Sequence, residues 1–82
     1  MSSMYRITEE DIERLLREKL EVIDLTVTDL KGGNHWEVVI KSPNFNGLNR
    51  IKQHKLIYEI LKEPMADESI HALAIKSSGT EE

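Results

Sequence analysis

The chain has no cysteine, one tryptophan, one phenylalanine and two prolines among its 82 residues. Without thiols it can form no disulfide framework and offers no thiolate to a metal or a substrate. Its apolar runs are only a few residues long, whereas a membrane-spanning helix needs roughly 20. The first residues turn acidic within ten positions and contain no apolar stretch of signal-peptide length. We therefore expect a cytoplasmic protein with no place in a membrane.

The length limits the fold to one small core, because a chain of this size buries only about 60–65% of the surface it exposes when unfolded. We predict a single domain over residues 8–77. Residues 1–7 are predicted to be a flexible N-terminus, and the polar residues 78–82 a disordered tail.

The net charge of −4 is unevenly distributed along the chain. Residues 1–30 carry four basic and eight acidic side chains, and residues 63–82 carry one basic and five acidic ones. Residues 31–62 carry six basic and two acidic ones, which makes this middle segment +4. This distribution indicates a local patch that could meet an acidic partner, in a chain that is not basic as a whole.

Two segments have the apolar periodicity of helices. Thr8 precedes three acidic residues and a one-sided apolar pattern, which predicts a helix over 8–20 with Thr8 as its N-cap. The second segment, 48–62, is apolar around most of its circumference, and we expect it to pack on two sides. Pro64 is expected to end it.

Three segments have the patterns of strands. Residues 21–30 and 35–41 alternate and are joined by "KGGN", which predicts an antiparallel hairpin. "IHALAIK", residues 70–76, follows the second helix and is predicted to return parallel to the second strand by a right-handed crossover. The predicted fold is α+β, with the order α-β-β-α-β and a three-stranded mixed sheet covered on one face by two helices.

This topology places two histidines at one edge of the sheet. His35 opens the second strand and His71 opens the third, and parallel neighbours about 4.8 Å apart begin at the same edge. The two imidazoles could therefore reach one bound ion or cluster. Register and facing cannot be derived from the pattern.

With these elements placed, the sequence resembles the BolA-like family. The resemblance is carried by "NHWEVVIKSPNFNGLNRIKQHKLIYEIL" and "IHALAIK", and it covers roughly residues 8–77. It implies a type II KH-like fold and a non-enzymatic partner of monothiol glutaredoxins that shares a 2Fe–2S cluster. The family's strand-opening histidine, a cluster ligand, maps onto His71.

The family's second ligand is a Cys or His from the loop between the first two strands. Here that loop, "LKGGNH", has no Cys, so His35 is the candidate, with a solvated hairpin residue as the alternative. The resemblance further implies a glutathione thiol from the partner side, no cofactor in the isolated chain, and a role in iron–sulfur trafficking, iron or redox regulation, or stress response. For His71 the alternative is a ring that only hydrogen-bonds backbone at a sheet edge.

Several other residues of the matched motifs are predicted to be structural. We expect Trp36 and Phe45 in the core, Gly47 in a turn, Tyr58 packed on the second helix, and His54 as a packed, hydrogen-bonded helix residue.

Four cations on or beside the second helix allow three interpretations. They are interpreted as a solvated helix face, as a docking surface for a protein partner, or as the DNA-contacting surface of a transcriptional regulator. The four residues are Arg50, Lys52, Lys55 and Lys62. Four cations can contact only a few phosphates, and the sequence lacks the GXXG loop with which KH domains clamp a nucleic-acid backbone. Both observations argue against strong nucleic-acid binding. No nucleotide, zinc or nucleophile motif is present, so we do not expect an enzyme. Whether the chain homodimerises, and whether Met1 or Met4 is its natural start, stays open.

Overall fold

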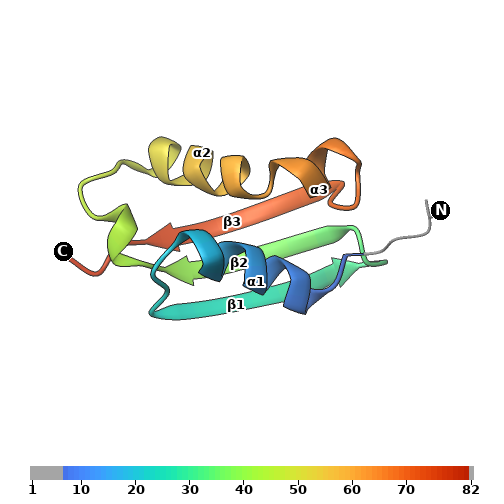
Figure 1. The fold of residues 1–82 in the computed structure, drawn as a ribbon, viewed down its shortest axis with the longest axis horizontal. Coiled ribbons are helices and arrows are strands. Elements are labelled where there is room, and N and C mark those ends of the chain that lie inside the picture. Colours follow the sequence, from blue (N-terminus) through green and yellow to red (C-terminus); the bar gives the residue numbers. More distant parts are fainter. Residues whose placement is uncertain (1–6, 82) are drawn as a thin grey trace.

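The computed structural model describes residues 7–81 of the chain. The elements follow the predicted α-β-β-α-β order, with two additional short helices (Figure 1). They are α1 (Glu9–Lys19), β1 (Asp24–Lys31), β2 (His35–Lys41), the 3-10 helix η1 (Pro43–Phe45), α2 (Arg50–Ile60), α3 (Lys62–Ala66) and β3 (Ala72–Ser78). Within the described part of the chain no helix is long and apolar enough to cross a membrane.

The sheet has the order β1-β2-β3, with β1 antiparallel and β3 parallel to β2. The mixed sheet predicted from the crossover rule is therefore confirmed. Alternation along β2 places Trp36, Val38 and Ile40 in the core, while Val39 is exposed on the opposite face. Both long helices cover the same face of the sheet, with α1 packed mainly on β1 and α2 on β3 (Figure 1).

The start of α1 is fixed by a capping box. The Thr8 hydroxyl accepts a hydrogen bond from the Asp11 amide at 3.2 Å, and the Asp11 carboxylate accepts one from the Thr8 amide at 3.0 Å. These bonds satisfy two backbone donors at the exposed helix start. Ile12 and Leu16 on the buried side of α1 are fully enclosed in the core.

The second helix differs from its prediction at both ends. It begins at Arg50, where the Asn49 side chain accepts a hydrogen bond from the Lys52 amide, and its last residue is Ile60. Pro64 does not end it. The helical path breaks earlier, at Leu61, and Pro64 is the third residue of α3, where a missing amide donor is tolerated.

The packing of α2 involves two neighbours, β3 and α1, as predicted, but it leaves part of the apolar surface of the helix uncovered. Ile57 and Leu61 are completely buried, whereas Ile51 is 67% exposed and Tyr58 is 41% exposed. Tyr58 is thus a surface residue, not a packed one. On its buried side the helix is tied to β3, because the Ser77 hydroxyl donates to Gln53 Oε1 at 2.6 Å.

The turn between β2 and α2 is built from the residues that the sequence marked as breakers. Phe45 is 1% exposed and anchors η1 in the core. Gly47 has a φ of +80°, in the left-handed region that favours glycine.

The ends of the domain extend past the predicted boundaries. Ile7 is buried in the core, and β3 continues to Ser78. The amides of Thr80 and Glu81 both donate to Asn46 Oδ1, at 2.8 and 3.0 Å, so this part of the predicted disordered tail is bonded to the fold. The rest of the predicted flexible ends, residues 1–6 and 82, lies outside the described residues.

Candidate functional site

The structure brings His35 and His71 together at one corner of the sheet. His35 is the first residue of β2 and lies opposite Ala72, the first residue of β3. His71 comes immediately before β3 and does not open it, a one-residue correction to the predicted position. The two rings are stacked, with centroids 5.5 Å apart and planes inclined by 18°. Both imidazoles therefore lie at the same corner of the sheet.

The backbone holds the two histidines side by side. The carbonyl of Asn34 accepts hydrogen bonds from the amide of His71 at 2.7 Å and from the amide of Ala72 at 3.2 Å. The residue before one histidine is thus bonded directly to the backbone of the other. Because the acceptor is a main-chain oxygen, which every residue has, this contact could not be predicted from the side chains in the sequence.

The loop that leads into His71 is fixed at two points. Ile70 is buried, which anchors the chain one residue before the ring. Earlier in the loop the Asp67 carboxylate accepts a hydrogen bond from the Ser69 amide at 2.9 Å, and this bond lowers the pKa of Asp67 below its ordinary value. Such aspartate turns are recognisable in sequence, and "DES" carries the signal.

The pair offers two nitrogen ligands that are open to a partner. His71 is exposed and His35 is half-buried. Within residues 7–81 there is no group of three or more His, Cys, Asp or Glu side chains that could hold a metal ion. At this corner the described residues could therefore supply two nitrogen donors to a metal and no complete ligand set.

The spacing of the rings is compatible with joint ligation. Metal–imidazole bonds of about 2.0–2.1 Å place two nitrogens on one tetrahedral metal about 3.3 Å apart. The near-parallel rings, with centroids 5.5 Å apart, place two such donors side by side at one corner. A cluster that needs two imidazole nitrogens from one protein thus fits the residues present.

His54 does not belong to this pair. It lies on α2 and is half-buried. Its Nε2 atom is buried and has no hydrogen-bond partner among the described residues, which corrects the prediction that this histidine is hydrogen-bonded.

The predicted basic surface is present on α2 and at the start of α3. Arg50, Lys52, Lys55 and Lys62 are all exposed. Lys62 donates to Glu59 at 3.1 Å, an exposed pair worth little energetically.

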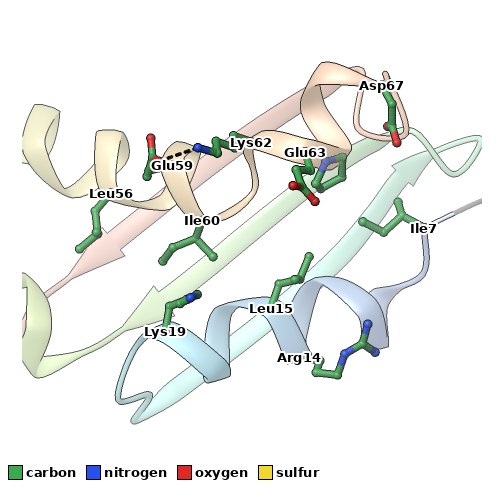
Figure 2. A pocket seen from close by; sticks show the side chains of 11 residues that line it. Ile7, Arg14, Leu15, Lys19, Leu56, Glu59, Ile60, Lys62, Glu63 and Asp67 are labelled. Carbon is green, nitrogen blue, oxygen red and sulfur yellow. Dashed lines mark hydrogen bonds and ion pairs between the residues drawn. The ribbon is translucent and has the colours of Figure 1, made fainter.

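A separate groove runs between α1 and the α2–α3 segment (Figure 2). Its volume is about 790 Å³, and Leu15, Leu56 and Ile60 point into it, with Lys19 and Glu63 at its rim. Neither His35 nor His71 lines it. The groove and the histidine corner are therefore different surfaces.

Comparison with known proteins agrees with this architecture. The family model described as "BolA-like protein" matches residues 12–82. The chain belongs to the BolA-like family.

Individual BolA-like proteins show how close the likeness is. Protein BOLA2 of Arabidopsis thaliana is 37% identical over 76 residues, which covers 90% of this chain and 80% of the relative. A bol-like protein from Babesia bovis has a TM-score of 0.84 at 25% identity and covers 94% of this chain and 90% of that one. The BolA domain of SufE1 from Arabidopsis thaliana has a TM-score of 0.81 at 26% identity, covering 90% and 95%.

Proposed function

We propose that this BolA-like protein is a non-enzymatic adaptor that binds a monothiol glutaredoxin and shares a 2Fe–2S cluster with it. The observation that carries the proposal is the stacked pair of His35 and His71, two nitrogen ligands at one accessible corner. The glutaredoxin would supply the remaining ligands, its own cysteine and a glutathione thiol. The cluster is cargo in this scheme, and the process is iron–sulfur trafficking or iron and redox regulation.

The ligand types explain what such an adaptor contributes. Imidazole in place of thiolate raises the reduction potential of a 2Fe–2S cluster. Imidazole also binds metal only through an unprotonated nitrogen, whereas the thiolates of the partner bring negative charge to the cluster.

The test adds the cluster-free protein to cluster-loaded monothiol glutaredoxin and records the visible circular dichroism. The wild-type protein is expected to change the spectrum, and His71→Ala is expected to abolish that change. His35→Ala is expected to reduce it. His54→Leu is the matched control, because it removes the chain's third imidazole outside the pair.

Two results contradict the proposal. One is a glutaredoxin spectrum that the wild-type protein leaves unchanged. The other is an equal change with wild type and with His71→Ala, since a ligand cannot be dispensable. Calorimetry with cluster-free glutaredoxin then separates docking without cluster sharing from the absence of any interaction.

The alternative function is transcriptional regulation by DNA binding through α2. The observation in its favour is that Arg50, Lys52 and Lys55 are exposed and make no ion pair within the described residues. Duplex binding that depends on these cations weakens with salt, with a slope of about 0.9 per phosphate contact in a log–log plot. Charge reversal at Lys52 and Lys55 is expected to reduce that slope if α2 contacts DNA.

A further inference from the structure

The hairpin turn before His35 contains a β-bulge. Asp29 pairs with Trp36, but the next pair joins Lys31 to His35, so one extra residue, Leu30, is inserted on β1. Bulges of this kind interrupt the ladder and redirect the chain beside functional sites. Here the bulge brings Lys31 opposite His35 and leaves residues 32–34 as a three-residue turn.

Ordering this turn costs conformational entropy. Gly32 and Gly33 both have positive φ, +71° and +84°, which glycine adopts without steric cost. Two consecutive glycines also lose more backbone entropy on folding than other residues. Other contacts must therefore hold the turn in one shape.

The side chain of Asp29 supplies two of these contacts. Its Oδ1 accepts hydrogen bonds from the amide of Lys31 at 3.0 Å and from the amide of Gly33 at 3.1 Å. The indole Nε1 of Trp36 donates to the carbonyl of Gly33 at 3.2 Å. Gly33 is thus fixed through both of its main-chain polar groups, and one of the two partners is the Asp29 carboxylate.

The fixed turn is coupled to both histidines. Asn34 follows Gly33 directly, and its carbonyl bonds the amides of His71 and Ala72. Movement of the turn would therefore displace His35, at the start of β2, relative to the backbone of His71. The 5.5 Å stack depends on the position of this peptide.

We propose that Asp29 is a positioning residue for the histidine pair: its carboxylate closes the bulged turn and so sets His35 against His71. The effect on the stack belongs to this chain alone, whereas the consequence for cluster binding rests on the proposed function. Asp29 bonds the turn and neither imidazole, so its removal acts only through the placement of His35. We expect Asp29→Ala to weaken the cluster-bridged complex by no more than His35→Ala does.

The first measurement needs no cluster and no partner. Imidazole chemical shifts of the isolated protein are recorded by NMR, with His71→Ala as the reference for an unstacked His35 ring. Asp29→Ala is expected to move the His35 resonances toward that reference. Asp29→Asn keeps a side-chain oxygen that can accept both bonds, and it is expected to retain the wild-type shifts.

Asp24→Ala is the matched control. Asp24 is an exposed aspartate at the other end of the same strand, opposite Lys41, so its removal changes the charge by the same amount. Thermal unfolding of every variant checks that the fold is kept. Wild-type His35 shifts in a folded Asp29→Ala protein overturn the proposal, and so does failure of Asp29→Asn to restore them.

The second measurement repeats the circular dichroism titration with cluster-loaded glutaredoxin. If Asp29→Ala loses the stack and also forms a weaker complex, by up to the loss seen for His35→Ala, the result supports both the positioning role and its consequence. A lost stack with undiminished cluster binding leaves the positioning role standing and refutes the proposed use of His35. An intact stack in Asp29→Ala refutes the positioning role, whatever the affinity of the cluster-bridged complex. Failure of the positioning role and failure of the proposed function are therefore distinguishable.

Discussion

Two isoleucines of α2 provide a matched test of how this helix packs. Ile57 is completely buried, and Ile51 is 67% exposed. The same change to Ala at either position, Ile51→Ala or Ile57→Ala, deletes the same atoms from the same helix. The difference between the two losses therefore reports burial.

The magnitudes follow from the exposures. Ile→Ala in a core typically costs about 2–5 kcal/mol, which is the expectation for Ile57. Only a third of Ile51 is buried, so a full burial energy of about 1.5–3 kcal/mol is reduced to about 0.5–1 kcal/mol. The higher helix propensity of Ala returns a few tenths of a kcal/mol. We expect Ile51→Ala to cost less than about 1 kcal/mol.

Urea denaturation of both variants measures these free energies of unfolding, and thermal unfolding gives a second reading. In a domain of this size about 1 kcal/mol lowers Tm by 4–8 °C, so Ile57→Ala is expected to lose at least about 8 °C. Equal losses for the two variants would refute the exposure of Ile51. They would mean that this side chain is covered in solution.

Three further predictions concern other parts of the fold. His54→Leu removes a buried Nε2 that has no hydrogen-bond partner among the described residues, and burying such an atom costs about 1–3 kcal/mol. Urea denaturation of this variant should therefore show a higher free energy of unfolding. A lower value would reveal a hydrogen bond at that nitrogen. Gly79→Ala places a Cβ against the Asn46 side chain, and amide hydrogen exchange at the next two residues should accelerate while Tm changes little; unchanged exchange would show that the tail does not depend on this contact. Asp67→Asn should be less stable than wild type above pH 3.8, the ordinary aspartate value, because the Ser69 amide lowers the folded-state pKa of Asp67. Thermal unfolding against pH should show that difference shrink as the pH falls through the lowered pKa, and a difference that persists at low pH would assign the loss to something other than charge.

The sheet could be predicted from sequence because its signals are strong and local. Alternation fixes which residues of β2 face the core, the two glycines mark the hairpin, and a strand after a helix returns parallel by the crossover rule. These signals give the strand order and the shared edge of His35 and His71. The bounds of β2 were also predicted correctly, at 35–41.

The wrong predictions concern features that tertiary packing determines and that the apolar periodicity of the sequence does not: which side chains of α2 are buried, where it ends, and how the C-terminal residues are attached. An apolar side chain such as Ile51 on a helix predicts burial only if a second layer exists, and the structure places one layer over the sheet. The break at Leu61 and the position of Pro64 inside α3 depend on the chain path into β3. The attachment of residues 80 and 81 depends on Asn46, more than 30 residues away in sequence.

The facing of the two imidazoles could not be predicted because it depends on backbone contacts. The bulge at Leu30 and the double acceptor at the Asn34 carbonyl leave no mark in hydropathy or residue type. Asp29 two residues before "KGGN" is a weak signal, since aspartates beside turns commonly bond nearby amides. Its two hydrogen bonds to the turn before His35 become visible only in the folded structure.

The number of ligands matters as much as their identity. A chain that offered four ligands would keep a metal or cluster on its own, because metal binding free energy grows with each ligand the folded chain has already placed. Under the proposed function, the two imidazoles at this corner make retention of the cluster conditional on the glutaredoxin that supplies the other ligands. The stacked pair is therefore consistent with the proposed adaptor, and if the turn holds both rings in place beforehand, as we propose, each encounter with the partner costs less ordering.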